Sequence, residues 1–257
     1  MEQKKRKGIV LKSPREIEIM RGANQHVAEV LEIMAQAVKP GVTTWDLDQI
    51  ARAEIKKRGV GSAFLGYHGF PATICASPNE VIVHGIPSKE VVLEEGDVIG
   101  LDIGLIYEGY VGDAARTIPV GTVDAETKRL LDVTKECLER AIKVCTPDHR
   151  LSDIGKAVQE HAETNGYGVV REFVGHGIGT TMHEDPQVPN YFSGPKPRLK
   201  SGMVIAIEPM VNQGTHEVDV LADGWTAVTR DRKLSAHFEH SVAITDGEPI
   251  VLSRLYH

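Results

Sequence analysis

The chain has 257 residues, enough for one large domain or two small ones, and its formal net charge of −7 argues against a nucleic-acid-binding protein. Hydrophobic residues make up 41% of the chain, but no apolar run reaches the length of a membrane span and no signal-peptide core is present. Three cysteines without a CxxC pair exclude a zinc knuckle or a disulfide framework, and they favour a soluble protein of the reducing cytoplasm.

The chain begins with a basic run, Lys4–Lys7. We interpret residues 1–12 as a flexible, solvated tail; contact with an acidic partner such as ribosomal RNA is the alternative. One catalytic domain is expected over residues 13–257.

Two helices are expected after the tail. Ser13 and Pro14, with an acid three residues after the serine, form a strong helix start, and helical spacing of apolar residues continues to Pro40-Gly41. A second helix is predicted from Thr44 to Gly59.

A β-hairpin is predicted over Val98–Thr117, with its turn at Glu108-Gly109. In that register Asp102 and Asp113 lie on the same face as diagonal neighbours, roughly 7–8 Å apart at the backbone. Two solvated acids on an exposed face are the simpler reading. The surrounding residues are apolar, however, so these carboxylates require a cationic partner, either a metal ion or Arg116.

The second half of the chain repeats the plan of the first. Helices are expected from Asp124 to about Cys145 and from Ser152 to about Asn165. When the second helix pair is aligned with the first at an offset of 107 residues, Pro40 matches Pro147 and Gly59 matches Gly166. The segment that ends at Asp102 matches the one that ends at Glu208 at an offset of 106. This duplication predicts an α/β fold of two pseudo-symmetric halves, about 13–123 and 124–257, with a site where they meet.

The second half adds further groups that could bind metal. Glu208 lies on a predicted strand Met203–Met210, and Glu239 precedes a strand predicted over Ser241–Thr245. Together with one histidine, the four acids Asp102, Asp113, Glu208 and Glu239 would form a site for two divalent ions. Four negative charges would balance two ions, and an oxygen-rich set with one imidazole suits Mn, Fe, Co or Zn. Paired ions of this kind activate a bridging water for amide hydrolysis.

Rival catalytic motifs are weak or absent. The chain contains no GxxxxGK[ST], HExxH or GxSxG sequence. Cys75 beside His84 could be a nucleophile, but a buried apolar cysteine is the simpler interpretation.

These residues carry a resemblance to the type I methionine aminopeptidases. It extends from about Ser13 to Ile250, and its key positions are Asp102, Asp113, His176, Glu208 and Glu239, with His84 in HGIP and His183 in MHEDP. The resemblance implies the pita-bread fold, in which a central antiparallel sheet is flanked by helices. It implies a metal-dependent enzyme that removes the initiator methionine from nascent chains whose second residue is small.

The resemblance also implies individual roles. Asp102 and Asp113 would bind one ion, and Asp113, His176, Glu208 and Glu239 the other, with Asp113 and Glu239 bridging. Glu208 would also act as the general base. His183 would donate to the scissile carbonyl oxygen, and His84 would contact the scissile nitrogen. The substrate's neutral α-amine would bind a metal.

The implied methionine pocket is lined by Tyr67, Phe70, Cys75, Met182 and Trp225. A monovalent cation, Na or K, is implied on oxygens of Asn79, Val81 and Ser235. Phe64 departs from the smaller residue that bacterial relatives often have at the pocket rim. The chain also lacks the cysteine-rich extension of eukaryotic type I enzymes, so we expect the short bacterial form.

Two other functions remain as alternatives. An Xaa-Pro peptidase on the same fold usually has an extra N-terminal domain, for which there is no room before Ser13. A catalytically inactive relative used as a binding module would typically lack metal ligands, and all five are present here. A monomer is expected.

Overall fold

The computed structural model describes residues 8–255, so the basic run Lys4–Lys7 lies outside it. Its helices are α1 (Pro14–Ala37), α2 (Thr44–Arg58), the short 3-10 helix η1 (Tyr67–Gly69), α3 (Ala125–Lys143) and α4 (Leu151–Thr164). Its strands are β1 (Gly61–Ser62), β2 (Cys75–Pro78), β3 (Val81–Val83), β4 (Val98–Tyr107), β5 (Tyr110–Pro119), β6 (Gly168–Val169), β7 (Gly175–Gly177), β8 (Glu184–Val188), β9 (Val204–Ile207), β10 (Met210–Asn212), β11 (Val218–Val220), β12 (Ala227–Thr229), β13 (Ser235–His237), β14 (His240–Ala243) and β15 (Ile250–Val251). None of the described helices is long and apolar enough to cross a membrane.

The helix boundaries follow the capping signals in the sequence. Ser13 caps α1 in a reciprocal capping box with Glu16, and Thr43 caps α2 in the same way with Asp46. Helix α2 ends at Arg58 and is capped by Gly59, whose φ of 65° is left-handed and therefore suits glycine. The four predicted α-helices are confirmed to within a few residues at each end.

The hairpin of β4 and β5 has the predicted register. Tyr107 pairs with Tyr110, and Gly104 lies opposite Asp113. Because side chains alternate between the two faces of a strand, the odd-numbered residues of β4 from Ile99 to Leu105 point into a buried core with α1 and α2. Asp102 and Asp113 are left on the opposite face.

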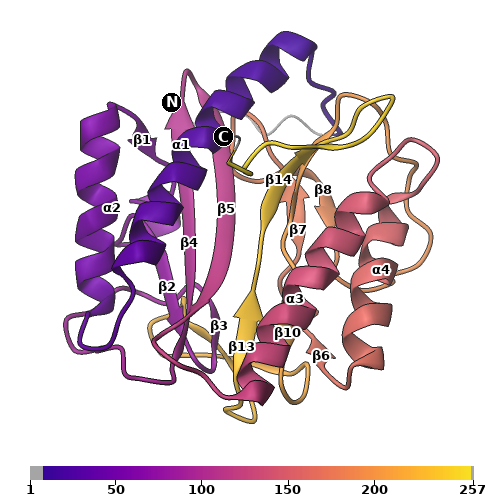
Figure 1. Cartoon of the computed structure of the whole chain (residues 1–257). Helices are drawn as coiled ribbons and strands as arrows, with labels where there is room; N and C mark the ends of the chain where they lie inside the picture. Colours follow the sequence, from indigo (N-terminus) through magenta and orange to yellow (C-terminus); the bar gives the residue numbers. More distant parts are fainter. Residues whose placement is uncertain (1–7, 256–257) are drawn as a thin grey trace.

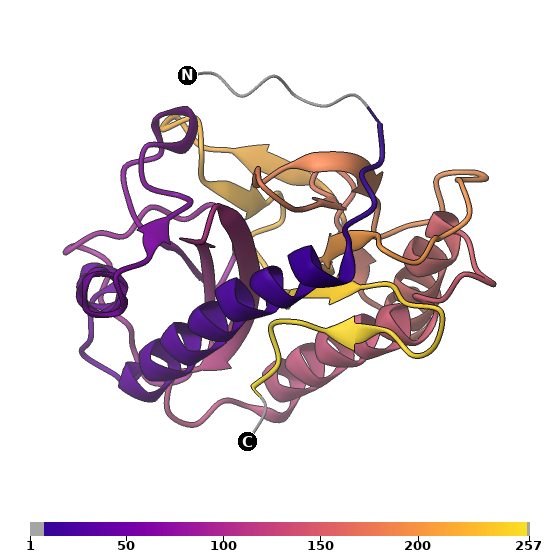
Figure 2. The same ribbon diagram turned by 90° about the horizontal axis from the view of Figure 1, so that it is seen from above.

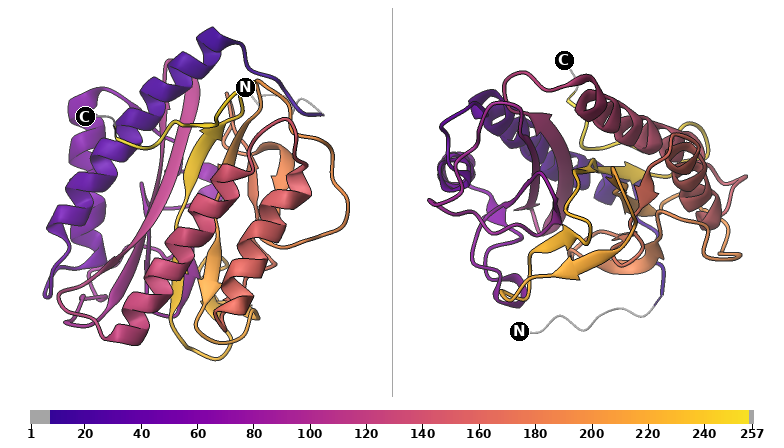
Figure 3. Two further views of the ribbon diagram at one scale, coloured as in Figure 1. Left: turned by 45° about the vertical axis from the view of Figure 1, so that its right-hand side comes forward. Right: turned by 90° about the horizontal axis from the view of Figure 1, so that it is seen from below.

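The two largest hydrophobic clusters among residues 8–255 each include their own helix pair. One core lies between α1, α2 and the strands β2, β4 and β5. The other lies between α3, α4 and the strands β9, β13 and β14. The two helix pairs flank opposite halves of the strand layer (Figures 1 and 2), and α3 packs alongside α4 (Figure 3). This is the arrangement that an α/β fold of two similar halves requires.

In the part of the chain that the structure describes, the strand layer is divided into four sheets, and neighbouring strands pair antiparallel. One predicted strand is wrong in its extent. Met203–Met210 divides into β9 and β10, which belong to different sheets, and Glu208 and Pro209 lie between them. Proline has no N–H to donate to a strand ladder, so the break occurs at this point.

The two halves are joined along β5. The Glu239 N–H donates to the Ala115 carbonyl oxygen at 2.8 Å, and the Ser241 hydroxyl donates to the Asp113 carbonyl oxygen at 2.9 Å. The first bond ties the backbone of Glu239 to β5, the strand that carries Asp113. The second ties the backbone of Asp113 to β14, which directly follows Glu239. The relative position of Asp113 and Glu239 is therefore fixed by one backbone hydrogen bond and one bond from a side-chain hydroxyl to the backbone.

Gly8 and Lys12, in the described part of the predicted tail 1–12, bond to the rest of the chain. The Lys12 side chain is only 4% exposed and forms an ion pair with Glu184 at 2.5 Å. Its backbone N–H donates to the Gly202 carbonyl oxygen, and the Gly8 N–H donates to Asp185 at 3.0 Å. Buried lysines need a paired acid, and here the partner directly follows His183.

Replacing Lys12 by methionine is expected to lower the free energy of unfolding by about 3 kcal/mol, because Glu184 loses its buried partner. The matched control is Lys128→Met, which breaks an ion pair with Asp132 whose side chains are 69% and 64% exposed. That change should cost less than about 0.5 kcal/mol. Urea unfolding measures both, and equal losses would show that the Lys12 pair is as weak as a surface pair.

Candidate active site

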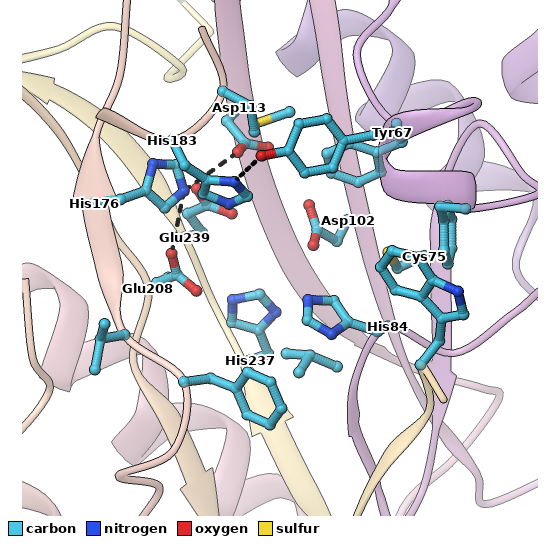
Figure 4. Close-up of a pocket in the computed structure, with 17 residues that line it drawn as sticks. Tyr67, Cys75, His84, Asp102, Asp113, His176, His183, Glu208, His237 and Glu239 are labelled. Carbon is cyan, nitrogen blue, oxygen red and sulfur yellow. Dashed lines mark hydrogen bonds and ion pairs between the residues drawn. The ribbon is translucent and has the colours of Figure 1, made fainter. Parts of the chain in front are cut away.

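Four carboxylates from both halves meet in one pocket. Asp102 comes from β4 and Asp113 from β5, whereas Glu208 follows β9 and Glu239 lies between β13 and β14. Figure 4 shows all four directed toward the same space. The break at Glu208-Pro209 and the short gap before β14 therefore place two acids of the second half opposite the hairpin of the first.

His176 supplies a nitrogen to this space from β7. Its Nδ1 lies 3.0 Å from the Gly177 carbonyl oxygen, which can only accept, so Nδ1 carries the proton. The Nε2 lone pair then points into the pocket, 3.8 Å from Asp113 Oδ2 and 3.5 Å from Glu208 Oε1. A backbone bond of this kind is the usual way in which proteins orient a metal-binding imidazole.

Burial makes these acids hard to ionise together. Burial raises the pKa of Asp102 to about 7. It also raises the pKa values of Asp113, Glu208 and Glu239 well above their usual range, and the neighbouring carboxylates raise them further. The pKa of His176 falls to about 4, chiefly through burial, so its imidazole is neutral at pH 7. The described residues alone do not compensate the charge of the ionised cluster.

Arg116, the alternative cationic partner, lies elsewhere. Its guanidinium is paired with Glu32 of α1 at 3.1 Å, because an even-numbered position of β5 faces away from Asp113. Buried oxygens of Asp102, Asp113 and Glu239 have no hydrogen-bond partner among the described residues. Ligand atoms of Asp113, His176 and Glu239 lie within 4.8 Å of one another. Unpaired carboxylate oxygens beside a neutral imidazole nitrogen fit a divalent cation of the transition series.

Two further histidines line the pocket. The Nδ1 atom of His183 lies 2.6 Å from the Tyr67 hydroxyl, and its ring is 4.3 Å from the ring of His176. His84 packs edge-on against Phe173 at 5.2 Å, and burial lowers the pKa of its imidazole. Both line the pocket that holds the acids, where an imidazole can donate or accept hydrogen bonds.

An apolar recess adjoins the acids. The residues predicted for it all line the pocket: Tyr67, Phe70, Cys75, Met182 and Trp225. Phe64 lines it too, and its ring stands at 90° to that of Phe70. Burial and the nearby acids raise the pKa of the Cys75 thiol well above its usual range, so it stays protonated. A neutral thiol is a poor nucleophile, which disfavours the cysteine mechanism.

Comparison with known proteins identifies the family. The sequence profile of metallopeptidase family M24 matches residues 18–246. The chain belongs to this family. It is 51% identical to the methionine aminopeptidase of Clostridium acetobutylicum, over 95% of this chain and 98% of that protein. It is 50% identical to methionine aminopeptidase 1 of Bacillus subtilis, over 96% of this chain and 100% of that protein.

The structural comparison agrees. The crystal structure of methionine aminopeptidase from Thermotoga maritima superposes with a TM-score of 0.94 at 45% identity, covering 96% of this chain and 100% of that chain. Prolidase from Pyrococcus furiosus shares the fold at 22% identity, with a TM-score of 0.77 over 96% of this chain and 66% of that chain. The predicted pita-bread fold and the resemblance to methionine aminopeptidases are both confirmed. As an M24 metallopeptidase the chain is a metal-dependent aminopeptidase.

Four residues that line the pocket of this M24 enzyme were not predicted from the sequence: Val83, Phe173, Val174 and His237. His237 is buried, and its Nε2 has no hydrogen-bond partner among residues 8–255. It lies two positions before Glu239, so strand alternation from that acid is the signal that could have found it. The other three carry no chemical signal in the sequence.

None of the three residues predicted for the monovalent cation lines the pocket that holds the acids. The Ser235 N–H donates to the Asn79 carbonyl oxygen at 2.9 Å, which brings two of the three predicted residues together. Val81 starts β3, two residues after Asn79. The Asn79 amide bonds Asp97 at 2.9 Å and its side-chain oxygen accepts from the Val98 N–H. Cation binding there stays a prediction.

Proposed function

We propose that this metallopeptidase removes N-terminal methionine by means of two divalent ions held between the halves of the fold. Asp102 and Asp113 would hold one ion, and the other would be held by Asp113, His176, Glu208 and Glu239. One observation carries the proposal: ligand atoms of Asp113, His176 and Glu239 lie within 4.8 Å of one another, in a pocket whose acids have buried oxygens without a hydrogen-bond partner among residues 8–255. Which metal serves, Mn, Fe, Co or Zn, depends on its availability as well as on the ligands.

The bound ions would lower the pKa of a shared water and polarise the scissile carbonyl. Glu208 is the proposed general base, and it would pass the proton of that water to the leaving amine. His183 would donate a hydrogen bond to the carbonyl oxygen as negative charge develops there. His84, which lies below Asp102 in Figure 4, would contact the nitrogen of the scissile amide.

The apolar recess would hold the methionine side chain. Its aromatic walls are firmly packed, since the Phe70 and Trp225 rings lie 5.1 Å apart in an edge-to-face arrangement. The protonated Cys75 thiol offers a soft, polarizable neighbour for a thioether. We propose that the substrate must also have a small residue at its second position.

We also propose the organisation of the molecule around this activity. The catalytic domain would comprise residues 13–257, with pseudo-repeats of about 13–123 and 124–257. The enzyme would act as a cytoplasmic monomer on nascent chains, with Na or K bound near Asn79, Val81 and Ser235. Contact of the basic run with the ribosome remains the alternative.

A peptide assay tests the proposed function. Metal-loaded enzyme is offered Met-Ala-Ser, Met-Lys-Ser and Ala-Pro peptides, with and without chelator. We expect cleavage of Met-Ala-Ser alone, and its loss with chelator. Activity on Ala-Pro alone would instead identify an Xaa-Pro peptidase, and no activity on any peptide would point to an inactive binding module.

A further inference from the structure

Two imidazoles stand side by side in the pocket with different partners at Nδ1. The rings of His176 and His183 are 4.3 Å apart at an interplanar angle of 74°. At His176 the Nδ1 partner is a carbonyl oxygen, which only accepts. At His183 the Nδ1 partner is the Tyr67 hydroxyl, at 2.6 Å. A carbonyl oxygen at Nδ1 keeps the proton of a neutral imidazole on Nδ1, whereas a phenol that donates to Nδ1 leaves the proton on Nε2.

The phenol of Tyr67 is a donor in this setting. Its oxygen lone pair is delocalised into the ring, so a phenol donates more strongly than it accepts. Burial raises the pKa of Tyr67 above its usual value, so the O–H proton is present at neutral pH. A distance of 2.6 Å is short, as expected for a strong donor bound to an imidazole lone pair.

The position of the hydroxyl is fixed by the backbone around it. Tyr67 starts the helix η1, and its N–H donates to the Phe64 carbonyl oxygen at 2.9 Å. The Phe70 N–H donates back to the Tyr67 carbonyl oxygen, also at 2.9 Å. Gly66 allows this turn with a φ of 81°. Figure 4 shows the phenol reaching from this turn to His183.

We propose that Tyr67 is a positioning residue that holds His183 in the tautomer with its proton on Nε2. His183 then offers a hydrogen-bond donor to the substrate, whereas the neighbouring His176 offers a lone pair to a metal ion. Tyr67 would thus do more than line the methionine pocket: it would assign different roles to two adjacent histidines. The inference rests on the proposed role of His183 as the donor to the carbonyl oxygen.

Kinetics of Tyr67→Phe provide the first test. The ring that lines the recess is kept and only the hydroxyl is lost, so kcat for Met-Ala-Ser should fall about tenfold while KM changes less than twofold. Tyr110→Phe is the matched control, because it removes a phenol that bonds Glu16 at 2.9 Å outside the pocket. Its kcat should equal that of the unaltered enzyme. An unchanged kcat in Tyr67→Phe would overturn the proposal.

The second test reads the tautomer directly and does not depend on activity. Nitrogen-15 NMR of histidine-labelled protein, metal-free and zinc-loaded, distinguishes protonated from bare ring nitrogens, and the His183 signals are assigned with His183→Gln. We expect Nε2–H in the unaltered protein and a mixture of tautomers in Tyr67→Phe. A proton on Nδ1 in the unaltered protein, or no change on removal of the hydroxyl, would refute the assignment.

The two proposals fail in different ways. If the unaltered enzyme does not cleave Met-Ala-Ser, the proposed function is wrong, and the NMR result still decides the tautomer. If it cleaves the peptide but Tyr67→Phe retains both kcat and tautomer, only the role of Tyr67 is wrong.

Discussion

Glu208→Gln is expected to leave the fold intact and to lower kcat by a factor of about 100 to 10,000, the range that loss of a general base produces. The side chain keeps its size and its place beside His176, whose Nε2 is 3.5 Å from Glu208 Oε1. The amide cannot take a proton from water, however, and it is a weaker metal ligand. Kinetics at saturating divalent ion, with circular dichroism for the fold, measure the effect.

The control for this change is Glu217→Gln. The Glu217 side chain is 46% exposed and pairs with Arg230 at 2.6 Å outside the pocket, so its loss should leave kcat within about twofold of the unaltered value. If Glu208→Gln kept near-normal kcat with the metal bound, Glu208 could not be the base.

The metal-free enzyme is expected to lose stability as the pH rises from about 4 to 7. Asp102 titrates near pH 7 in the folded chain but near 4 when unfolded, so the folded state holds the proton longer. A group whose pKa is raised in the folded state stabilises the fold fully at a pH below its pKa in the unfolded state. This contribution is lost as the pH rises through its pKa in the folded state. For Asp102 alone the loss is roughly 3–4 kcal/mol, and Asp113, Glu208 and Glu239 shift in the same direction.

Urea unfolding of chelated protein between pH 4.5 and 7.5 measures this slope. Asp102→Asn should flatten it, because the amide does not titrate. Added divalent ion should reverse it, since ion binding requires the ionised acids. A chelated enzyme that grew more stable over this range would show that the acids are compensated by groups of the protein itself.

The sequence predicted the framework because its signals are local. The capping box at Ser13 and the left-handed Gly59 bound their helices, and a two-residue turn set the register of β4 and β5. That register alone placed Asp102 and Asp113 on one face. The repeat offset then identified Glu208 as the counterpart of Asp102 in the second half.

What the sequence could not predict depends on contacts between distant segments. The pairing of Arg116 with Glu32 needs the packing of α1 on β5, and the burial of Lys12 needs Glu184, 172 residues away. The bond from Tyr67 to His183 needs the turn at η1 and the loop before β8 to meet across the pocket. Such pairs have no spacing in the chain by which they could be recognised.

The most direct test of the metal centre is a crystal structure of the enzyme soaked with Mn, with anomalous scattering used to locate the ions. The account predicts two anomalous peaks between the halves of the fold, within bonding distance of oxygens of Asp102, Asp113, Glu208 and Glu239 and of His176 Nε2. The account would be contradicted if, at saturating Mn, peaks appeared only outside this pocket or no ion lay within bonding distance of the four acids.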